Sequence, residues 1–390
     1  MRRVSIEERR ARLGRRHRLL GSARTDDVVA ITSSLVGLHS SDPATVVLSA
    51  AARMRTPSVA AVESALYDDR VLVRTLCMRR TMFVVPVELV PVVQAACTDA
   101  LVPGERRRTL QLLEGSGVRD AARVLRRLER ATYAAIVERG EATGAELARL
   151  VPGLDHKIPV GEGKKWAGTI GVSTRVLFLL STEQRIVRGR PKGSWTSSQY
   201  RWAPITAWLP DGVPSWSADE ARVELVRRWL LAFGPGTVAD IKWWSGLTMG
   251  AVRKALATLD AEEVDLGGTT GVSLPGDGPV RPLGRPWVAL LPGLDATTMG
   301  WQQREWYLGE HGPAVFDRNG NAGPTVWADG RVIGGWSQRA TGEIAFRLLE
   351  DVGSDVGAAV GAEAARLEAW LGDVRVTPRF PTPLQRELLD

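Results

Sequence analysis

One short segment of this sequence, His39-Ser40-Ser41-Asp42-Pro43, combines residue types that could act on a substrate with residue types that start a helix. An imidazole titrates near neutral pH, so His39 could bind a water molecule or accept a proton from it. Asp42 before Pro43 is a strong helix start, because aspartate caps the first turn and proline suits the first helical position. Capping explains these two residues. His39 and Ser41 remain either reactive groups or residues that pack and hydrogen-bond at the helix start.

The rest of the sequence offers few other patterns typical of a catalytic or metal site. None of the four histidines lies in an HExxH or CxxC context, which argues against zinc. There is no P-loop and no GxSxG elbow, and the carboxylates form no recognisable pair. Cys77 and Cys97 are too few for a disulfide framework, so we expect buried free thiols. We expect no metal and no organic cofactor.

Length and composition predict a cytoplasmic protein of several domains. A chain of 390 residues is too long for one compact core and predicts about two to four domains. Its hydrophobic content of 44% and charged content of 24% are those of ordinary globular proteins. No apolar run reaches the roughly 18 residues of a membrane span, and the basic N-terminus lacks the apolar core of a signal peptide. We expect no membrane association.

The distribution of charge favours a polyanionic partner. The net charge is +7 and the isoelectric point about 9.8. Residues 1–24 hold nine arginines against two glutamates, residues 101–130 hold eight arginines against four acids, and residues 185–201 hold five basic groups and no acid. Residues 350–373, in contrast, hold six acids and one arginine. Arginine suits bidentate contact with phosphate. The alternative is a GC-rich genome that encodes arginine where other genomes encode lysine.

The N-terminal segments predict the order helix, helix, helix, hairpin, which is the order of a winged helix. Apolar spacing and the Asp-Pro helix start define the helices, with a turn at residues 39–42 and a basic break at Arg79-Arg80 in the hairpin. The expected elements are helices over 26–38, 43–55 and 59–67, and a hairpin over 71–86.

The same pattern recurs twice. Capping boxes at Thr143/Glu146 and Ser217/Glu220 each open a helix. Each of the two later units ends in two strands around a loop rich in glycine and other turn residues. The second unit should contain helices over 119–138, 143–150 and 164–181 and a hairpin over 184–202. The third should contain a helix from 217 to 233, a short helix capped by Thr237, a helix over 249–259 and strands within 262–275.

The C-terminal part changes character. Residues 276–286 are rich in glycine and proline and read as a linker. The segments WVALLPGLD, PTVWADGRVIGGW and EIAFRLL then indicate short strands of a barrel or open sheet, followed by a helix over about 356–371.

Four motifs follow one another in the order found in a known family. They are LVGLHSSDPATVVLSAAARM, RTLCMRRTMFVVP, GPGTVADIKWWSGL, and the pair LLPGLDATTMGW and NAGPTVWADGRVIGGW. Together they span most of the chain and resemble the winged-helix DNA-binding family that contains the AlkZ and YcaQ DNA glycosylases. The resemblance implies an α+β, helix-rich fold in which three tandem winged helices and a C-terminal β-barrel-like domain form a concave DNA cradle. The implied domains are 1–118 (with a basic N-terminal arm), 119–208, 209–280 and 281–390.

The resemblance also implies a reaction and its residues. Characterised members hydrolyse the N-glycosidic bond of alkylated purines, and some unhook interstrand crosslinks. Their catalytic signature is Gln-x-Gln or Gln-x-Asp just before the Asp-Pro helix start, and a His-x-Gln form exists. In this sequence the two positions are His39 and Ser41, so His39 would position or activate water and Ser41 would assist. Asp42 is expected to serve as the helix cap.

DNA contacts are expected on the predicted hairpins and on the third recognition-like helix. Aromatic residues interleaved with basic ones in residues 184–202 suit a wing that follows the DNA backbone and stacks on bases. The expected contacts are Arg74, Arg79, Arg80, Arg185, Arg188, Arg190, Lys192, Arg253 and Lys254.

Three functions follow from this reading. The first is a cytoplasmic, nucleoid-associated repair glycosylase that binds damaged double-stranded DNA, acts as a monomer and needs no cofactor. The second is a winged-helix DNA-binding or regulatory protein that has lost its activity together with the glutamine pair. The third is a protein that binds a DNA-intercalating small molecule, and a large apolar pocket in place of a basic cleft would favour it.

Overall fold

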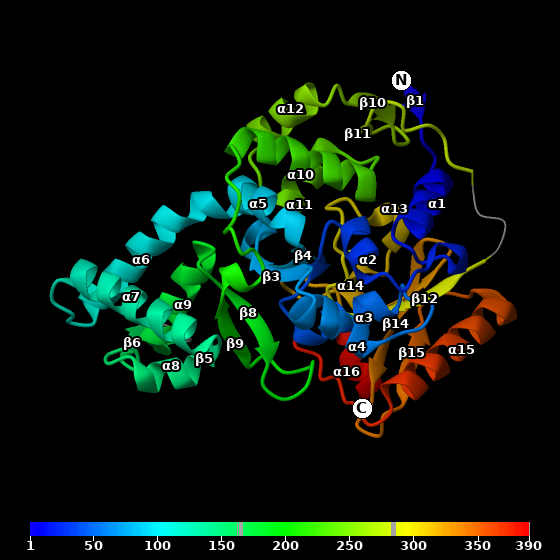
Figure 1. Cartoon of the computed structure of the whole chain (residues 1–390). Helices are drawn as coiled ribbons and strands as arrows, with labels where there is room; N and C mark the ends of the chain where they lie inside the picture. Colours follow the sequence, from blue (N-terminus) through cyan, green and yellow to red (C-terminus); the bar gives the residue numbers. More distant parts are fainter. Residues whose placement is uncertain (162, 164–166, 282–285, 390) are drawn as a thin grey trace.

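Three helical units, each with a three-stranded sheet, and a fourth unit around a four-stranded sheet make up the chain (Figure 1). The computed structural model describes all residues except 162, 164–166, 282–285 and 390. The second unit projects from one side of the molecule, and the first unit lies between the other three (Figure 1). The structure is therefore mixed α+β and rich in helix, as expected.

The first unit follows the predicted order and confirms its hairpin. Its elements are α2 (Val28–Ser34), α3 (Pro43–Ala51), α4 (Val59–Glu63), β2 (Leu38–His39), β3 (Leu72–Leu76), β4 (Met82–Pro86), α5 (Val90–Val93) and α6 (Val102–Gly115). The sheet order is β2-β4-β3, and Leu38 and His39 pair with Val84 and Phe83. The predicted helix 26–38 was too long and the predicted turn at 39 was wrong. Val36 takes a left-handed φ of 63°, which ends the helix and sends the chain into β2.

Gly37 shows why this strand fits against β4. A Cβ atom at Gly37 would lie 2.9 Å from the carbonyl oxygen of Val84 and 2.9 Å from a methyl carbon of Val85. The close approach of the two backbones thus requires glycine here. It fixes where His39 enters the sheet.

The second unit confirms the predicted helices over 119–138 and 143–150 and the hairpin over 184–202. Its elements are α7 (Ala121–Arg139), β5 (Ala142–Thr143), α8 (Gly144–Leu150), β6 (Lys157–Val160), β7 (Gly168–Gly171), α9 (Val172–Thr182), β8 (Ile186–Pro191) and β9 (Tyr200–Pro204). The sheet order is β5-β9-β8, and Thr143 forms the predicted capping box with Glu146. The predicted helix 164–181 was wrong at residues 168–171. Residues 164–166 lie outside the described part, and Gly168–Gly171 pair with β6, because glycine and β-branched residues favour an extended chain there.

The third unit matches the prediction closely and also takes up the N-terminus. Its elements are β1 (Arg2–Arg3), α1 (Ile6–Arg16), α10 (Ala218–Phe233), α11 (Val238–Ser245), α12 (Met249–Thr258), β10 (Glu262–Asp265) and β11 (Thr270–Ser273). Strand β1 runs parallel to β10 and extends this sheet. Several N-terminal arginines serve internal structure: Arg12 and Arg16 pair with Asp277, and Arg9 stacks on Trp306 at 4.0 Å. Much of the positive charge in residues 1–24 is therefore structural.

The fourth unit has an open sheet, one of the two forms that its strand pattern indicated, and not the barrel-like domain that the resemblance implied. Its elements are β12 (Val288–Leu291), α13 (Glu305–Leu308), α14 (Gly312–Val315), β13 (Thr325–Ala328), β14 (Arg331–Gln338), β15 (Ile344–Leu348), α15 (Gly353–Leu371) and α16 (Pro383–Leu389). The described strands form one sheet in the order β12-β13-β14-β15, with β12 and β15 at its edges. Helix α15 packs against both edge strands, so a helix covers the region where a barrel would have closed.

Among the described residues, one helical run, Val87–Gly115, is long and apolar enough to cross a membrane by composition. Half of its most apolar window is buried inside the protein, and core helices of soluble proteins meet the same criterion.

Candidate nucleic-acid interface

The segment singled out from the sequence joins β2 to α3. Asp42 caps α3 as predicted: its carboxylate accepts the backbone N–H of Ala44 at 3.0 Å, and Pro43 occupies the first turn. Burial raises the pKa of the Asp42 carboxyl above its ordinary value. Just before the cap, the backbone N–H of Ser40 donates to the carbonyl oxygen of Met82, which prolongs the pairing with β4. The segment is therefore held from both ends.

The His39 side chain is buried in the protein interior, and the residue is 4% exposed. Its ring meets Phe83 edge to face at 5.0 Å, and its Nδ1 accepts the backbone N–H of Ser41 at 3.4 Å. Burial, assisted by the positive charge of Arg79, lowers the pKa of His39 to about 3. The imidazole is therefore neutral at physiological pH, and an acceptor at Nδ1 places its proton on Nε2.

Ser40, which is 2% exposed, and the half-buried Ser41 line a cleft, and two guanidinium groups reach them. Arg74 of β3 donates to the hydroxyl of Ser40, and Arg379 of the C-terminal segment donates to the carbonyl oxygen of Ser41 at 2.7 Å. Arg74 is 4% exposed and its guanidinium lies 4.7 Å from the ring of Tyr200. The first unit, the second unit and the C-terminal segment thus meet at these serines.

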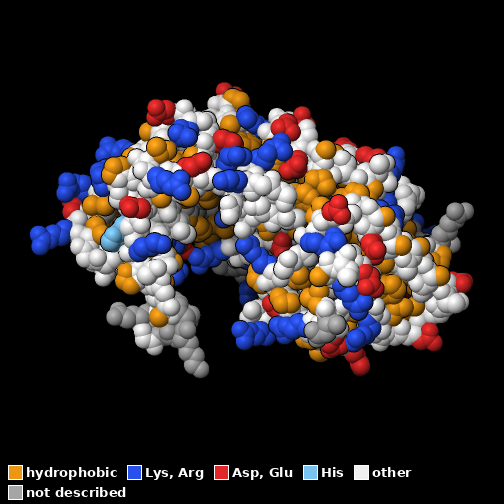
Figure 2. Space-filling view, turned by 90° about the horizontal axis from the view of Figure 1, so that it is seen from below, with side chains coloured by type: hydrophobic (Ala, Val, Ile, Leu, Met, Phe, Trp, Pro, Cys, Tyr) orange, Lys and Arg blue, Asp and Glu red, His pale blue; other side chains and the backbone are white. Residues whose placement is uncertain are grey.

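The cleft itself has a volume of about 690 Å³. Its described lining includes the cations Arg188, Lys192 and Arg379 and no carboxylate. The aromatic rings of Tyr200 and Trp202, from β9, complete one wall, and the N-terminal part of α8 and the outer face of α9 form another. Figure 2 shows the molecule hollowed between the second unit and the rest, with lysine and arginine side chains at the hollow. This lining mixes apolar residues with three cations and several hydroxyl groups, and so differs from the large apolar pocket that would favour a small intercalating molecule.

The other predicted DNA contacts fall outside this cleft. Arg79 and Arg80, both with left-handed φ, line a separate hollow together with residues 96–101 and 245–251; Arg79 stacks on Trp243 at 4.0 Å and Arg80 pairs with Glu105. Arg190 and Lys254 are paired with Asp68 and Asp219, at 2.8 and 2.6 Å. Arg185 stacks on Tyr133 at 4.4 Å, and Arg253 is exposed on α12. Of the nine predicted contacts, Arg188 and Lys192 line the cleft, and the buried Arg74 contacts two of its lining residues, Ser40 and Tyr200.

Two residues at the cleft were missed from the sequence. Ser40 lies between the two predicted catalytic positions, and its role depends on Arg74, which is distant in sequence. Arg379 lies in a segment without helix or strand between α15 and α16, and no motif marks it. Only the folded chain brings it to Ser41.

A buried ion pair fixes α3 against the fourth unit. Arg53 and Asp295 are both fully buried and make two hydrogen bonds, at 2.8 and 2.9 Å. Asp295 also accepts from the hydroxyl of Ser49 and from the backbone N–H of Thr297. Burial opposes ionisation of Asp295, but the charge and hydrogen bonds of Arg53, together with the hydrogen bonds from Ser49 and Thr297, lower its pKa. The network satisfies both charges and sets the position of the helix that begins at Asp42.

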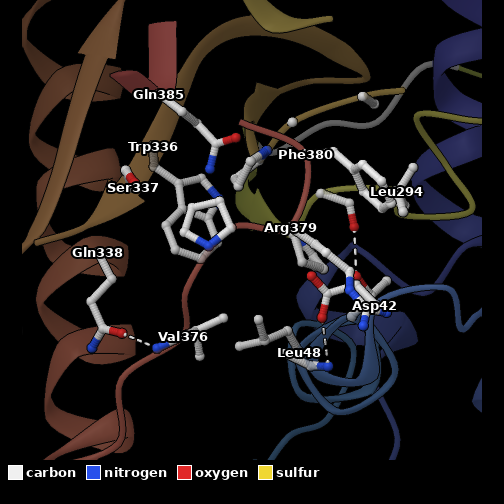
Figure 3. Close-up of a pocket in the computed structure, with 18 residues that line it drawn as sticks. Asp42, Leu48, Leu294, Trp336, Ser337, Gln338, Val376, Arg379, Phe380 and Gln385 are labelled. Atoms are coloured by element: carbon white, nitrogen blue, oxygen red, sulfur yellow. Dashed lines mark hydrogen bonds between the residues drawn. The ribbon is translucent and has the colours of Figure 1, made fainter. Parts of the chain in front are cut away.

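A smaller pocket lies on the other side of Arg379 (Figure 3). Its volume is about 50 Å³, enough for one or two water molecules and too small for a nucleobase. Figure 3 shows Arg379 beside Asp42, and Gln338 bonded to the backbone of Val376. Among the described residues, no three side chains of His, Cys, Asp or Glu gather as metal ligands would.

Comparison with known proteins identifies the family. Residues 32–370 match the family described as DNA glycosylase AlkZ-like. The fold is similar to that of the Streptomyces sahachiroi DNA glycosylase AlkZ, with a TM-score of 0.71 and 21% sequence identity, over 97% of this chain and 99% of that chain. No protein with a curated description matches the sequence. Because the family match covers most of the chain, this protein belongs to the AlkZ-like family of DNA glycosylases, which are DNA repair proteins.

Proposed function

We propose that this protein hydrolyses the N-glycosidic bond of alkylated purines in double-stranded DNA at the basic cleft. The observation that supports this proposal is the position of Ser40 and Ser41, in the segment that resembles the family's catalytic signature, on the wall of that cleft. A lining that carries cations and, among its described residues, no carboxylate suits a polyanion.

The chemistry requires little acid catalysis. An alkylated purine is already a cationic leaving group, so the transition state is oxocarbenium-like and the protein has to hold a water molecule near the anomeric carbon. We propose that Ser41 holds this water and that His39 is a positioning residue behind it, through its bond to the N–H of Ser41. A strong base role for His39 is disfavoured, because its buried site opposes a positive charge on the ring.

We further propose that the first three units are winged-helix modules. Support comes from the repeated order of helices followed by a hairpin, with a third strand beside each hairpin: β2, β5 and β1. In this proposal Arg74, Arg188 and Lys192 contact DNA within the cleft, and the other predicted cations contact it further out or serve structure. Two free cysteines fit a reducing cytoplasm, and we propose a monomer that acts there on the nucleoid.

The test is base release. Purified protein is incubated with duplex DNA that contains 7-methylguanine, and alkaline heating then reveals abasic sites as strand breaks. The variants are Ser41→Ala and His39→Ala, and Ser33→Ala on α2 serves as a matched control. We expect the wild type and the control to release the base, and Ser41→Ala to be slower by at least about tenfold.

Each other outcome has a clear meaning. Full activity in both Ser41→Ala and His39→Ala would remove the assignment of this segment. No base release by the wild type, together with tight binding to undamaged DNA, would overturn the enzymatic proposal in favour of a DNA-binding protein without activity. No DNA binding, and no dependence of binding on salt, would overturn the nucleic-acid assignment itself.

A further inference from the structure

Two guanidinium groups lie over one tyrosine ring at the wall of the cleft, and a third lines the same cleft. Those of Arg74 and Arg188 lie 4.7 and 5.3 Å from the centre of the Tyr200 ring, on strands β3 and β8. Arg379 lines the same cleft, and its charge, like those of Arg74 and Arg188, acts on the Tyr200 hydroxyl. The three cations come from the first unit, the second unit and the C-terminal segment.

This arrangement is unfavourable without an anion. Among the described residues, none of the three guanidinium groups has a carboxylate within ion-pair distance. The charge of Arg379 does act on Asp42 and opposes the rise in pKa that burial causes in its carboxyl, but that carboxylate caps α3. Arginine does not lose its proton in proteins, so the repulsion persists at every physiological pH. Burial chiefly, and then the charges of Arg74 and Arg379, lower the pKa of Arg188.

Two polar atoms at this position lack partners. The Nε of Arg74 and the hydroxyl of Tyr200 are buried and make no hydrogen bond to the described residues. Arg74 is 4% and Tyr200 8% exposed, so each side chain is more than nine-tenths buried. Such groups usually have a partner, and both are donors that an anionic oxygen would satisfy.

We propose that Arg74, Arg188 and Arg379, with Tyr200, bind one phosphodiester group of the DNA backbone next to Ser40 and Ser41. This inference rests on the proposed function, because it assigns the anion to DNA. The cleft is far larger than a single phosphate, and Trp202 and Lys192 also line it, which suits a DNA strand that passes through. Arg74 and Arg379 also hold Ser40 and Ser41, so the bound phosphate lies at a fixed position relative to the proposed water site.

The test measures binding without base excision. Duplex DNA with a tetrahydrofuran abasic analogue is titrated with wild-type protein, Arg188→Gln and Arg379→Gln over a range of salt concentrations. Each variant should bind about tenfold more weakly and lose about one unit of slope in the plot of log affinity against log salt. Arg123→Gln, which removes the same charge from the exposed start of α7 where Arg123 pairs with Asp120, is the matched control and should bind like the wild type.

A second experiment locates the phosphate. In a set of duplexes, each carries one neutral methylphosphonate linkage. At one linkage the wild type should lose about as much affinity as Arg379→Gln, and the two changes together should cost no more than either alone. Losses that add at every linkage would overturn the proposal. Thermal unfolding confirms that each variant is folded.

A third measurement separates DNA from free phosphate. Inorganic phosphate is compared with chloride at equal ionic strength. Stabilisation of the wild type but not of Arg188→Gln, combined with equal DNA affinity of the two proteins, would assign the site to a free phosphate and overturn the DNA assignment. If both variants bind DNA more weakly while the wild type never releases 7-methylguanine, the phosphate site stands and the proposed activity fails. If both variants bind DNA normally while the wild type releases 7-methylguanine, the proposed activity stands and the phosphate site fails.

Discussion

The buried, neutral state of His39 leads to a prediction about acid stability. In the folded protein the pKa of His39 is lowered from 6.5 to about 3. Below about pH 6.5, His39 binds a proton in the unfolded chain but stays neutral in the folded chain. The free energy of unfolding therefore falls as the pH falls, and this loss levels off near pH 3. At pH 5 the penalty is about 2 kcal/mol, since the unfolded histidine is mostly protonated and the folded one is not.

His39→Gln removes this titration but keeps a polar side chain. Near pH 7.5 the variant should be less stable by about 1 kcal/mol, because the edge-to-face contact with Phe83 at 5.0 Å is lost. At pH 5 the order should reverse, since the wild type has lost about 2 kcal/mol that the variant keeps. Urea unfolding followed by tryptophan fluorescence at the two pH values measures both differences.

Two results would refute this reasoning. A constant stability difference between His39→Gln and the wild type at both pH values would show that folding does not lower the pKa of His39. A base-release rate that falls with an inflection near pH 6.5 in the wild type, and not in His39→Gln, would show that His39 titrates during the reaction as a base. The control is His156→Gln, whose ring is exposed in the folded protein; its stability should follow the wild type.

Three further predictions concern the elements around this segment. Asp295→Ala should lower the free energy of unfolding by about 3–5 kcal/mol in urea titrations, because it leaves the buried charge of Arg53 without a partner; a loss below about 1 kcal/mol would mean that water or another group replaces the carboxylate. Gly37→Ala should cost about 1–3 kcal/mol and slow base release, since the added Cβ would lie 2.9 Å from the Val84 carbonyl oxygen; unchanged stability and rate would show that β2 can shift freely. Ser41→Gln restores an amide at the second catalytic position of relatives and should speed base release from 7-methylguanine DNA; a slower variant would show that the shorter hydroxyl is required.

The sequence alone determined the local elements of this protein. Apolar spacing and capping residues predicted most helices, and the capping box at Thr143 and the cap at Asp42 form as expected, because such signals depend on neighbouring residues. Prediction failed where tertiary pairing overrides local preference. Leu38 and His39 form a strand because β4 is available to pair with them, and Gly168–Gly171 form a strand because β6 lies opposite.

Only the tertiary structure decided which residues of the candidate site line the cleft. The sequence indicated the segment from His39 to Ser41, but the packing of β2 on β4 buries His39 and Ser40 and leaves Ser41 as the most exposed of the three, on the cleft wall. Clusters of basic residues in the sequence did not show which arginines are structural, since the partners of Arg12 and Arg16 are some 260 residues away. Arg379 joins the site across an even longer distance, because burial and charge depend on the fold and not on neighbours in the chain.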